Sequence, residues 1–176
     1  LWAEYADGKV TKEEINRQRY LYPLEAVGAG DSTLAKAYER DALTMIPTKS
    51  KLMPHAREVL EYLSGKYNLY ILSNGFKELQ SHKMRSSGID EYFKKVVLSD
   101  DIGILKPWPE IFHFALSTTQ SELNNSLMIG DSWENDIVGA AGVGMHQVFY
   151  NLSGRTDLPF APTYQITDLK DLFNFL

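Results

Sequence analysis

LMIGDSWENDI, residues 127–137, places three acidic side chains directly after a short apolar run. The acidic residues are Asp131, Glu134 and Asp136. Burial of apolar surface accounts for the run Leu127–Ile129 but not for the carboxylates that follow it. Two interpretations are open from these residues alone: the carboxylates bind a metal ion, or they cap the N-terminus of a helix.

The chain after about residue 51 alternates short apolar runs with helical segments. Strands are expected over residues 68–74, 94–100, 126–131 and 146–151, and helices over 53–67, 76–89, 109–119, 135–145 and 167–176. Strands that alternate with helices form parallel sheets, because a parallel strand pair needs a long crossover connection. The pattern therefore predicts an α/β fold with a Rossmann-like parallel sheet.

Residues 1–50 follow a different pattern and contain no convincing strand. Three helices are expected here. The first ends at Gly8, the second begins after a capping box formed by Thr11 and Glu14, and the third has Asp31 or Ser32 as its N-cap. We therefore expect a small all-helical domain in this part of the chain, followed by the α/β domain.

Composition narrows the function class. The 176 residues carry a formal net charge of −5, which gives no support to nucleic acid as a partner. The lack of cysteine excludes a disulfide scaffold, a thiolate zinc site and a cysteine nucleophile, and it fits a reducing cytoplasm. No apolar run approaches the roughly 18 residues that a membrane span needs. We expect a cytoplasmic protein that binds neither nucleic acid nor membrane; its oligomeric state is open.

Small and acidic residues end three of the expected strands, at residues 73–75, 99–101 and 130–132. Lys106 follows the second of these strands in a loop. Since parallel sheets bind ligands at the carboxyl ends of their strands, we expect a hydroxyl, an ammonium and a carboxylate to meet at one rim. A phosphate ester suits this set. Lys106 would supply counter-charge, Ser73 would donate a hydrogen bond, and Asp131 would hold a magnesium ion.

Each of these residues also has an ordinary structural interpretation. The segment Ser73-Asn74-Gly75 is common turn chemistry, and most lysines, Lys106 included, are expected at the solvated surface. Asp131 and Asp136 can cap a helix and interact with its dipole. Only their occurrence together, in this order at strand ends, favours a functional site.

The order and spacing of four segments resemble the motifs of the haloacid dehalogenase (HAD) superfamily of phosphatases: LSNG (72–75), KP (106–107), PEIF (109–112) and GDSWENDI (130–137). The resemblance covers residues 52 to about 150. It implies a HAD-like α/β core over residues 51–176 and a partial helical cap over about residues 1–50.

The resemblance also implies a role for each residue at the rim. The segment Ser73-Asn74-Gly75 would bind the phosphoryl group together with Lys106, and Ser73 and Lys106 would be catalytic residues. Asp131 would bind Mg²⁺. Asp136 would support it, either by holding a metal-bound water or by orienting Lys106.

The first motif of this family, Asp-x-Asp, does not occur in the 176 residues. In the family this motif supplies the nucleophile and the general acid, and its strand lies at the centre of the sheet. We therefore expect a segment upstream of Leu1 that carries the motif. Without that strand, a gap should separate the strands that end at Ser73 and Asp131. The core over residues 51–176 would thus lack its first strand.

The expected function is magnesium-dependent hydrolysis of a small phosphorylated metabolite through an aspartyl-phosphate intermediate. The substrate would be a phosphate ester of the nucleotide, sugar or glycolate class. Two alternatives are open: a catalytically inactive binding or regulatory module, and a metal-independent haloacid dehalogenase. The acidic pair Asp131 and Asp136 favours the phosphatase, because the dehalogenase branch generally lacks it. Arg17 and Arg19 of the cap are candidates for substrate contacts, or ordinary surface arginines.

Overall fold

The structure is a computed structural model that describes residues 4–5 and 9–176. Its internal contacts divide the chain into two compact units. Unit 1 comprises the residues up to Ser50 together with Glu78–Ser86, and unit 2 comprises Lys51–Lys77 and Ser87–Leu176. The assignment of about residues 1–50 as a cap domain stays a prediction.

The described part of unit 1 contains helices joined by turns and no strand, and most of the helix expected to end at Gly8 lies outside it. Its elements are α2 (Lys12–Ala26), α3 (Ser32–Met45), η1 (Ile46–Thr48) and most of α5 (Lys77–Ser87). The expected capping box of α2 is present: the Glu14 amide donates to Thr11 Oγ1 at 3.2 Å, and the Thr11 amide donates to Glu14 Oε2 at 2.8 Å. Asp31 is the N-cap of α3, because its Oδ1 accepts from the Thr33 amide at 2.7 Å. Helix α2 packs against α3.

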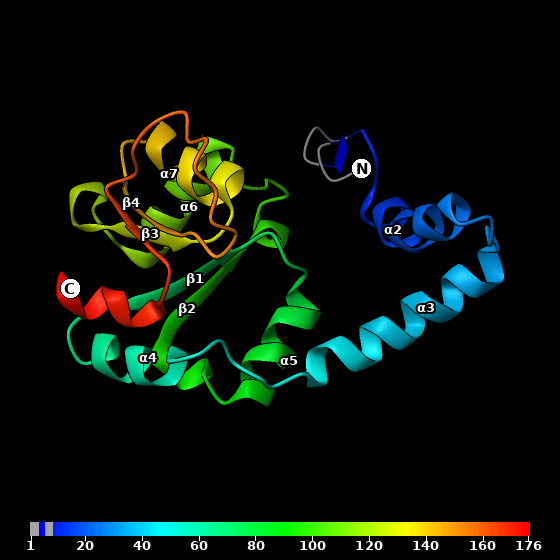
Figure 1. The fold of residues 1–176 in the computed structure, drawn as a ribbon, viewed down its shortest axis with the longest axis horizontal. Helices are drawn as coiled ribbons and strands as arrows, with labels where there is room; N and C mark the ends of the chain where they lie inside the picture. Colours follow the sequence, from blue (N-terminus) through cyan, green and yellow to red (C-terminus); the bar gives the residue numbers. More distant parts are fainter. Residues whose placement is uncertain (1–3, 6–8) are drawn as a thin grey trace. The chain divides into compact units, whose positions relative to one another are not determined.

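Unit 2 contains two parallel sheets. One pairs β1 (Leu69–Ser73) with β2 (Phe93–Leu98), which run side by side in Figure 1. The other has the order β3-β4-β5, formed by β3 (Leu127–Gly130), β4 (His146–Tyr150) and β5 (Tyr164–Ile166). Within the described residues β1 and β3 do not pair, which agrees with the expected gap. The upstream strand itself stays a prediction.

Among the described residues, the helices of unit 2 help to bury three apolar clusters, the third of them around Trp133. The elements are α4 (Ala56–Ser64), η2 (Asp90–Tyr92), η3 (Ser99–Asp101), α6 (Pro109–Thr119), η4 (Leu123–Asn125), η5 (Trp133–Val138), α7 (Gly139–Gly142) and η6 (Leu169–Asn174). Helix α4 and η6 pack together, as Figure 1 shows, and bury Leu63 and Leu172 with Val148 of β4. Ile111 and Phe112 of α6 form the centre of the second cluster.

Three expectations about secondary structure were wrong in detail. The helix expected over 135–145 is two elements, a π-helix (η5) followed by the short α7. The closing helix is a 3₁₀-helix, η6. Strand β5 was missed, because three residues with a polar centre give no apolar run to recognise. No helix in the described part of the chain has both the length and the apolar character to cross a membrane.

Candidate active site

Lys106 is the centre of the rim at the carboxyl ends of β1 and β3. Its side chain is only 10% exposed. Its Nζ donates to the Leu72 carbonyl of β1 at 2.8 Å and to Asp136 Oδ1 at 2.6 Å. Asp136 lies in η5, directly after β3. The ammonium therefore joins the two sheets, which share no strand pair within the described residues.

The side chain of Asn74 fixes the main chain of Lys106. Asn74 Oδ1 accepts from the Lys106 amide at 2.8 Å, and Asn74 Nδ2 donates to the Lys106 carbonyl at 3.0 Å. The peptide bond between Lys106 and Pro107 is cis. Asn74 thus places the lysine opposite the end of β1. Its expected role in binding a phosphoryl group stays a prediction.

The segment Ser73-Asn74-Gly75 makes a tight turn at the end of β1. The half-buried Ser73 hydroxyl accepts from the Gly75 amide at 3.0 Å. Such a bond is a local side-chain turn, and it holds the hydroxyl at the rim. The structure therefore brings Ser73, Asn74 and Lys106 together, as the sequence indicated.

The two carboxylates expected to hold a metal ion differ in their surroundings. Asp136 is buried, and both its oxygens have protein donors: Lys106 Nζ on Oδ1, and the Ser132 amide on Oδ2 at 3.1 Å. Asp131 is exposed and has no hydrogen bond or ion pair with any described residue. Its carboxylate is a hard oxygen donor of the kind that Mg²⁺ takes. Asp131 thus fits a direct ligand, whereas Asp136 orients Lys106.

Gly130 permits the conformation of Asp136. A Cβ at position 130 would lie 2.3 Å from Asp136 Oδ2, far inside van der Waals contact. The carboxylate therefore folds back over the end of β3 only because residue 130 has no side chain. Within the described residues, no three His, Cys, Asp or Glu side chains form a ready metal cluster.

Glu134, the third acid of the segment, faces a different cation. Its Oε1 accepts from Arg155 Nη1 at 2.8 Å. The hydrogen bond from Arg155 is the main cause that lowers the pKa of Glu134 below its ordinary value. Arg155 Nε also lies 3.4 Å from Asp157 Oδ1. Sequence reasoning missed this pair, because Arg155 lies in the irregular loop after β4, where no pattern in the sequence marks it.

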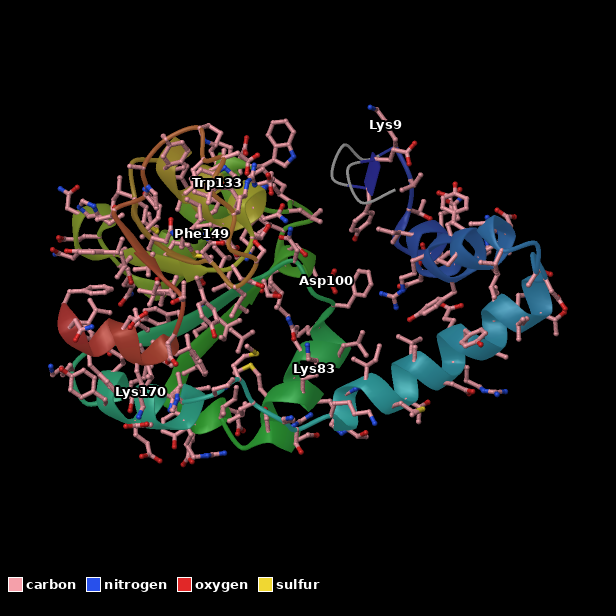
Figure 2. All side chains as sticks on the ribbon, in the orientation of Figure 1. Lys9, Lys83, Asp100, Trp133, Phe149 and Lys170 are labelled. Carbon is pink, nitrogen blue, oxygen red and sulfur yellow. The ribbon has the colours of Figure 1, made fainter. Side chains whose placement is uncertain are left out.

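Two aromatic rings pack against Trp133, the first residue of η5. Figure 2 shows the side chains of Trp133 and Phe149 close together, and their ring centroids are 5.2 Å apart in an edge-on arrangement. The ring centroid of Phe160 lies 4.9 Å from that of Trp133. These contacts hold the start of η5 on the sheet.

Arg17 and Arg19, the two candidates for substrate contacts, both lie in α2 of unit 1. Arg17 is exposed, and the Arg19 guanidinium lies 4.8 Å from the ring centroid of Tyr20. Their expected contacts with a substrate stay a prediction.

The family model of haloacid dehalogenase-like hydrolases matches residues 3–144. The chain belongs to this family. The resemblance drawn from its motifs is thereby confirmed, together with the α/β fold class and the assignment as a hydrolase.

Relatives align along the whole chain. It is 29% identical over 180 residues to the HAD-hydrolase YfnB of Bacillus subtilis, covering 100% of this chain and 75% of the relative. It is 29% identical over 178 residues to the pyrimidine 5'-nucleotidase YjjG of Escherichia coli, covering 100% and 77%. The crystal structure of YfnB bound to magnesium matches with a TM-score of 0.87 and 28% identity, over 98% of this chain and 75% of that one.

Proposed function

We propose that the protein is a magnesium-dependent hydrolase of a small phosphate monoester. The observation that carries the proposal is the buried Lys106, held between the Leu72 carbonyl and Asp136 at the carboxyl ends of β1 and β3. A buried cation at this edge of a parallel sheet is suited to binding an anion.

Within the described residues, Lys106 keeps one ammonium proton without an acceptor, which leaves it for a substrate. An ammonium has three protons, and two hydrogen bonds with protein acceptors fix its direction. The third proton would bind a phosphoryl oxygen, and the positive charge would offset charge that develops during transfer. Ser73, at the end of β1, would donate its hydroxyl proton to a second phosphoryl oxygen.

Asp131 would hold the metal ion directly, and Asp136 would support it by keeping Lys106 and the Ser132 amide in place. When bound, Mg²⁺ would reduce the repulsion between the phosphate and the carboxylates. The magnesium bound to the YfnB crystal structure supports this part of the proposal by likeness.

The nucleophile belongs to the Asp-x-Asp motif that we propose upstream of Leu1. Its first carboxylate would attack phosphorus as the bond to the ester oxygen breaks, and the second Asp would protonate the leaving alkoxide. Water activated by that second Asp would then hydrolyse the aspartyl phosphate and return both residues to their starting state.

A nucleotide, sugar or glycolate phosphate is the proposed class of substrate. Among the relatives, YjjG is named as a pyrimidine 5'-nucleotidase, and a protein of Thermus thermophilus, 30% identical over 154 residues, as a phosphoserine phosphatase. The second covers 85% of this chain and 59% of the relative. We place the enzyme in the cytoplasm, and we propose no nucleic-acid or membrane partner.

The test is a panel of phosphate monoesters, assayed with the full protein in the presence and absence of Mg²⁺. Asp131→Asn keeps the size of the side chain but removes the charge that the ion needs, so turnover at physiological magnesium should fall to background. Asp157→Asn, a change of the same kind at an exposed acid, should keep full activity.

Other outcomes point elsewhere. Substantial activity of Asp131→Asn would contradict the metal assignment. If the protein releases halide from a haloacid and this activity persists in EDTA, the protein is a metal-independent dehalogenase. A dehalogenase is named among the similar solved structures, with a TM-score of 0.83 and 25% identity. A full protein with neither activity would be a binding or regulatory module.

A further inference from the structure

Glu134 is the one acid of the segment 130–137 whose placement depends on a solvent-exposed ion pair. Its side chain is 69% exposed, and Arg155 Nη1 holds it at 2.8 Å. Asp136 by contrast is enclosed, with both oxygens bonded to protein donors. Asp131 is open to solvent. The function proposed above accounts for these two aspartates but gives no reason for the arginine.

Arg155 is itself firmly placed. Asn151 is only 3% exposed, and its side chain bonds the main chain of Arg155 twice: Oδ1 accepts from the amide at 2.9 Å, and Nδ2 donates to the carbonyl at 2.8 Å. The Asn151 amide donates to the Ile166 carbonyl of β5 at 2.9 Å. The guanidinium carbon lies 5.6 Å from the ring centroid of Trp133. The arginine is therefore anchored to the sheet through a buried side chain.

We propose that Arg155 sets the metal preference of the site by withholding Glu134 from the ion. With Glu134 held on Arg155, the segment offers the ion a single carboxylate, that of Asp131. Mg²⁺ binds through one or two carboxylates and retains several waters, whereas Ca²⁺ takes about six to eight oxygen ligands. A segment that keeps one acid out of reach therefore selects Mg²⁺ over Ca²⁺. This inference rests on the function proposed above.

Sequence spacing makes Glu134 the natural extra ligand once it is released. It follows Asp131 by only three residues, and the two lie on either side of Ser132, the N-cap of η5. Its longer side chain would move toward Asp131 when the arginine no longer holds it. Because its charge is then unpaired, attraction to a bound cation favours this movement.

Calorimetric titration of the full protein with MgCl₂ and with CaCl₂ tests the inference. Arg155→Gln should tighten Ca²⁺ binding by up to about fivefold, because the gain cannot exceed the worth of the exposed pair that is removed, and it should change Mg²⁺ binding much less. The double variant Arg155→Gln with Glu134→Gln should return to the preference of the unchanged protein. Asp157→Asn removes the second partner of Arg155 without releasing Glu134, so it should leave the preference unchanged.

An unchanged ratio of Ca²⁺ to Mg²⁺ affinity in a folded Arg155→Gln variant would overturn the inference. So would a shift that persists in the double variant, because the arginine would then not act through Glu134. Thermal unfolding checks each variant. If Arg155→Gln does not fold, Arg155→Lys keeps the charge but loses the planar fork, and it should give a smaller shift in the same direction.

Hydrolysis assays on the same samples separate the two proposals. Magnesium-dependent hydrolysis together with an unchanged preference in Arg155→Gln would overturn the role of Arg155 alone. A protein that neither binds Mg²⁺ nor hydrolyses any ester would overturn both.

Discussion

Two ion pairs hold the segment 130–137, one through Asp136 and one through Glu134, and they differ mainly in their exposure to water. The inner pair, Lys106 with Asp136, is 2.6 Å long, with side chains 10% and 7% exposed. The outer pair, Arg155 with Glu134, is 2.8 Å long, with side chains 29% and 69% exposed. The two pairs therefore differ in their contribution to stability although their distances are nearly equal.

Solvent decides what each pair contributes. Removing one partner of a buried pair leaves a charge that water cannot reach, which costs about 3–5 kcal/mol. An exposed pair is worth roughly 0–1 kcal/mol, because water screens it and two long side chains must be ordered. The inner pair thus belongs to the architecture that joins the two sheets, whereas the outer pair can adjust the site at little cost in stability.

Loss of Lys106 is the strongest way to break the inner pair. Lys106→Met should lower the free energy of unfolding by about 3–5 kcal/mol, because the Asp136 carboxylate stays buried without its cation. Urea unfolding measures the loss. Adding Asp136→Asn to this variant should recover part of it, since an amide carries no charge. A loss below about 1 kcal/mol for Lys106→Met would show that the pair behaves as a surface pair.

A methyl group at residue 130 tests how tightly the inner side is packed. Gly130→Ala puts its Cβ 2.3 Å from Asp136 Oδ2 and should push the carboxylate off the Ser132 amide. Overpacking of this kind costs typically about 1–3 kcal/mol. Gly142→Ala is the matched control, because nothing lies within 4 Å of its added Cβ, so it should be neutral or slightly stabilising. Equal unfolding midpoints for the two variants would refute the close contact.

The outer pair should show a small dependence on pH. Arg155 lowers the pKa of Glu134 in the folded protein, chiefly by its hydrogen bond. The unfolded chain therefore binds the proton more readily, so the pair's contribution is present above the ordinary glutamate pKa and is lost as pH falls through the lowered value. With Glu134 largely exposed, the contribution should stay below about 1 kcal/mol.

Urea unfolding at pH 6 and at pH 3 measures this dependence. Glu134→Gln should make the stability change between the two pH values smaller than in the unchanged protein. Added salt should shrink the difference further, since the pair is accessible to ions. A larger pH effect in Glu134→Gln would contradict the assignment.

Apolar runs and the residue types at strand ends were enough to predict which side chains meet at the rim beside Lys106. The runs that became β1 and β3 placed Ser73 and Asp131 at one rim, and the loop after β2 brought Lys106 there. Their exact contacts were not predictable. Both oxygens of Asp136 face protein donors because the chain turns as a π-helix, and its sequence carries no mark of that geometry.

The outer ion pair, Arg155 with Glu134, could not be predicted for a different reason. Arg155 lies in an irregular loop whose position is set by the buried Asn151, and such a contact has no periodicity to recognise. Strand β5 was missed with it, since Tyr164–Ile166 pairs with β4 but has little apolar character of its own.

The side-chain amide of Asn74 allows the loop before Lys106 to vary in length. Asn74 bonds both the amide and the carbonyl of Lys106, so one side chain at the end of β1 sets the position of the lysine. In the loop after η3, Ile102 and Ile104 pack against the cluster of Ile111 and Phe112, whereas Gly103 between them is exposed. The entropy of closing a loop grows slowly with its length, so residues inserted beside Gly103 would lengthen the loop without moving the ammonium.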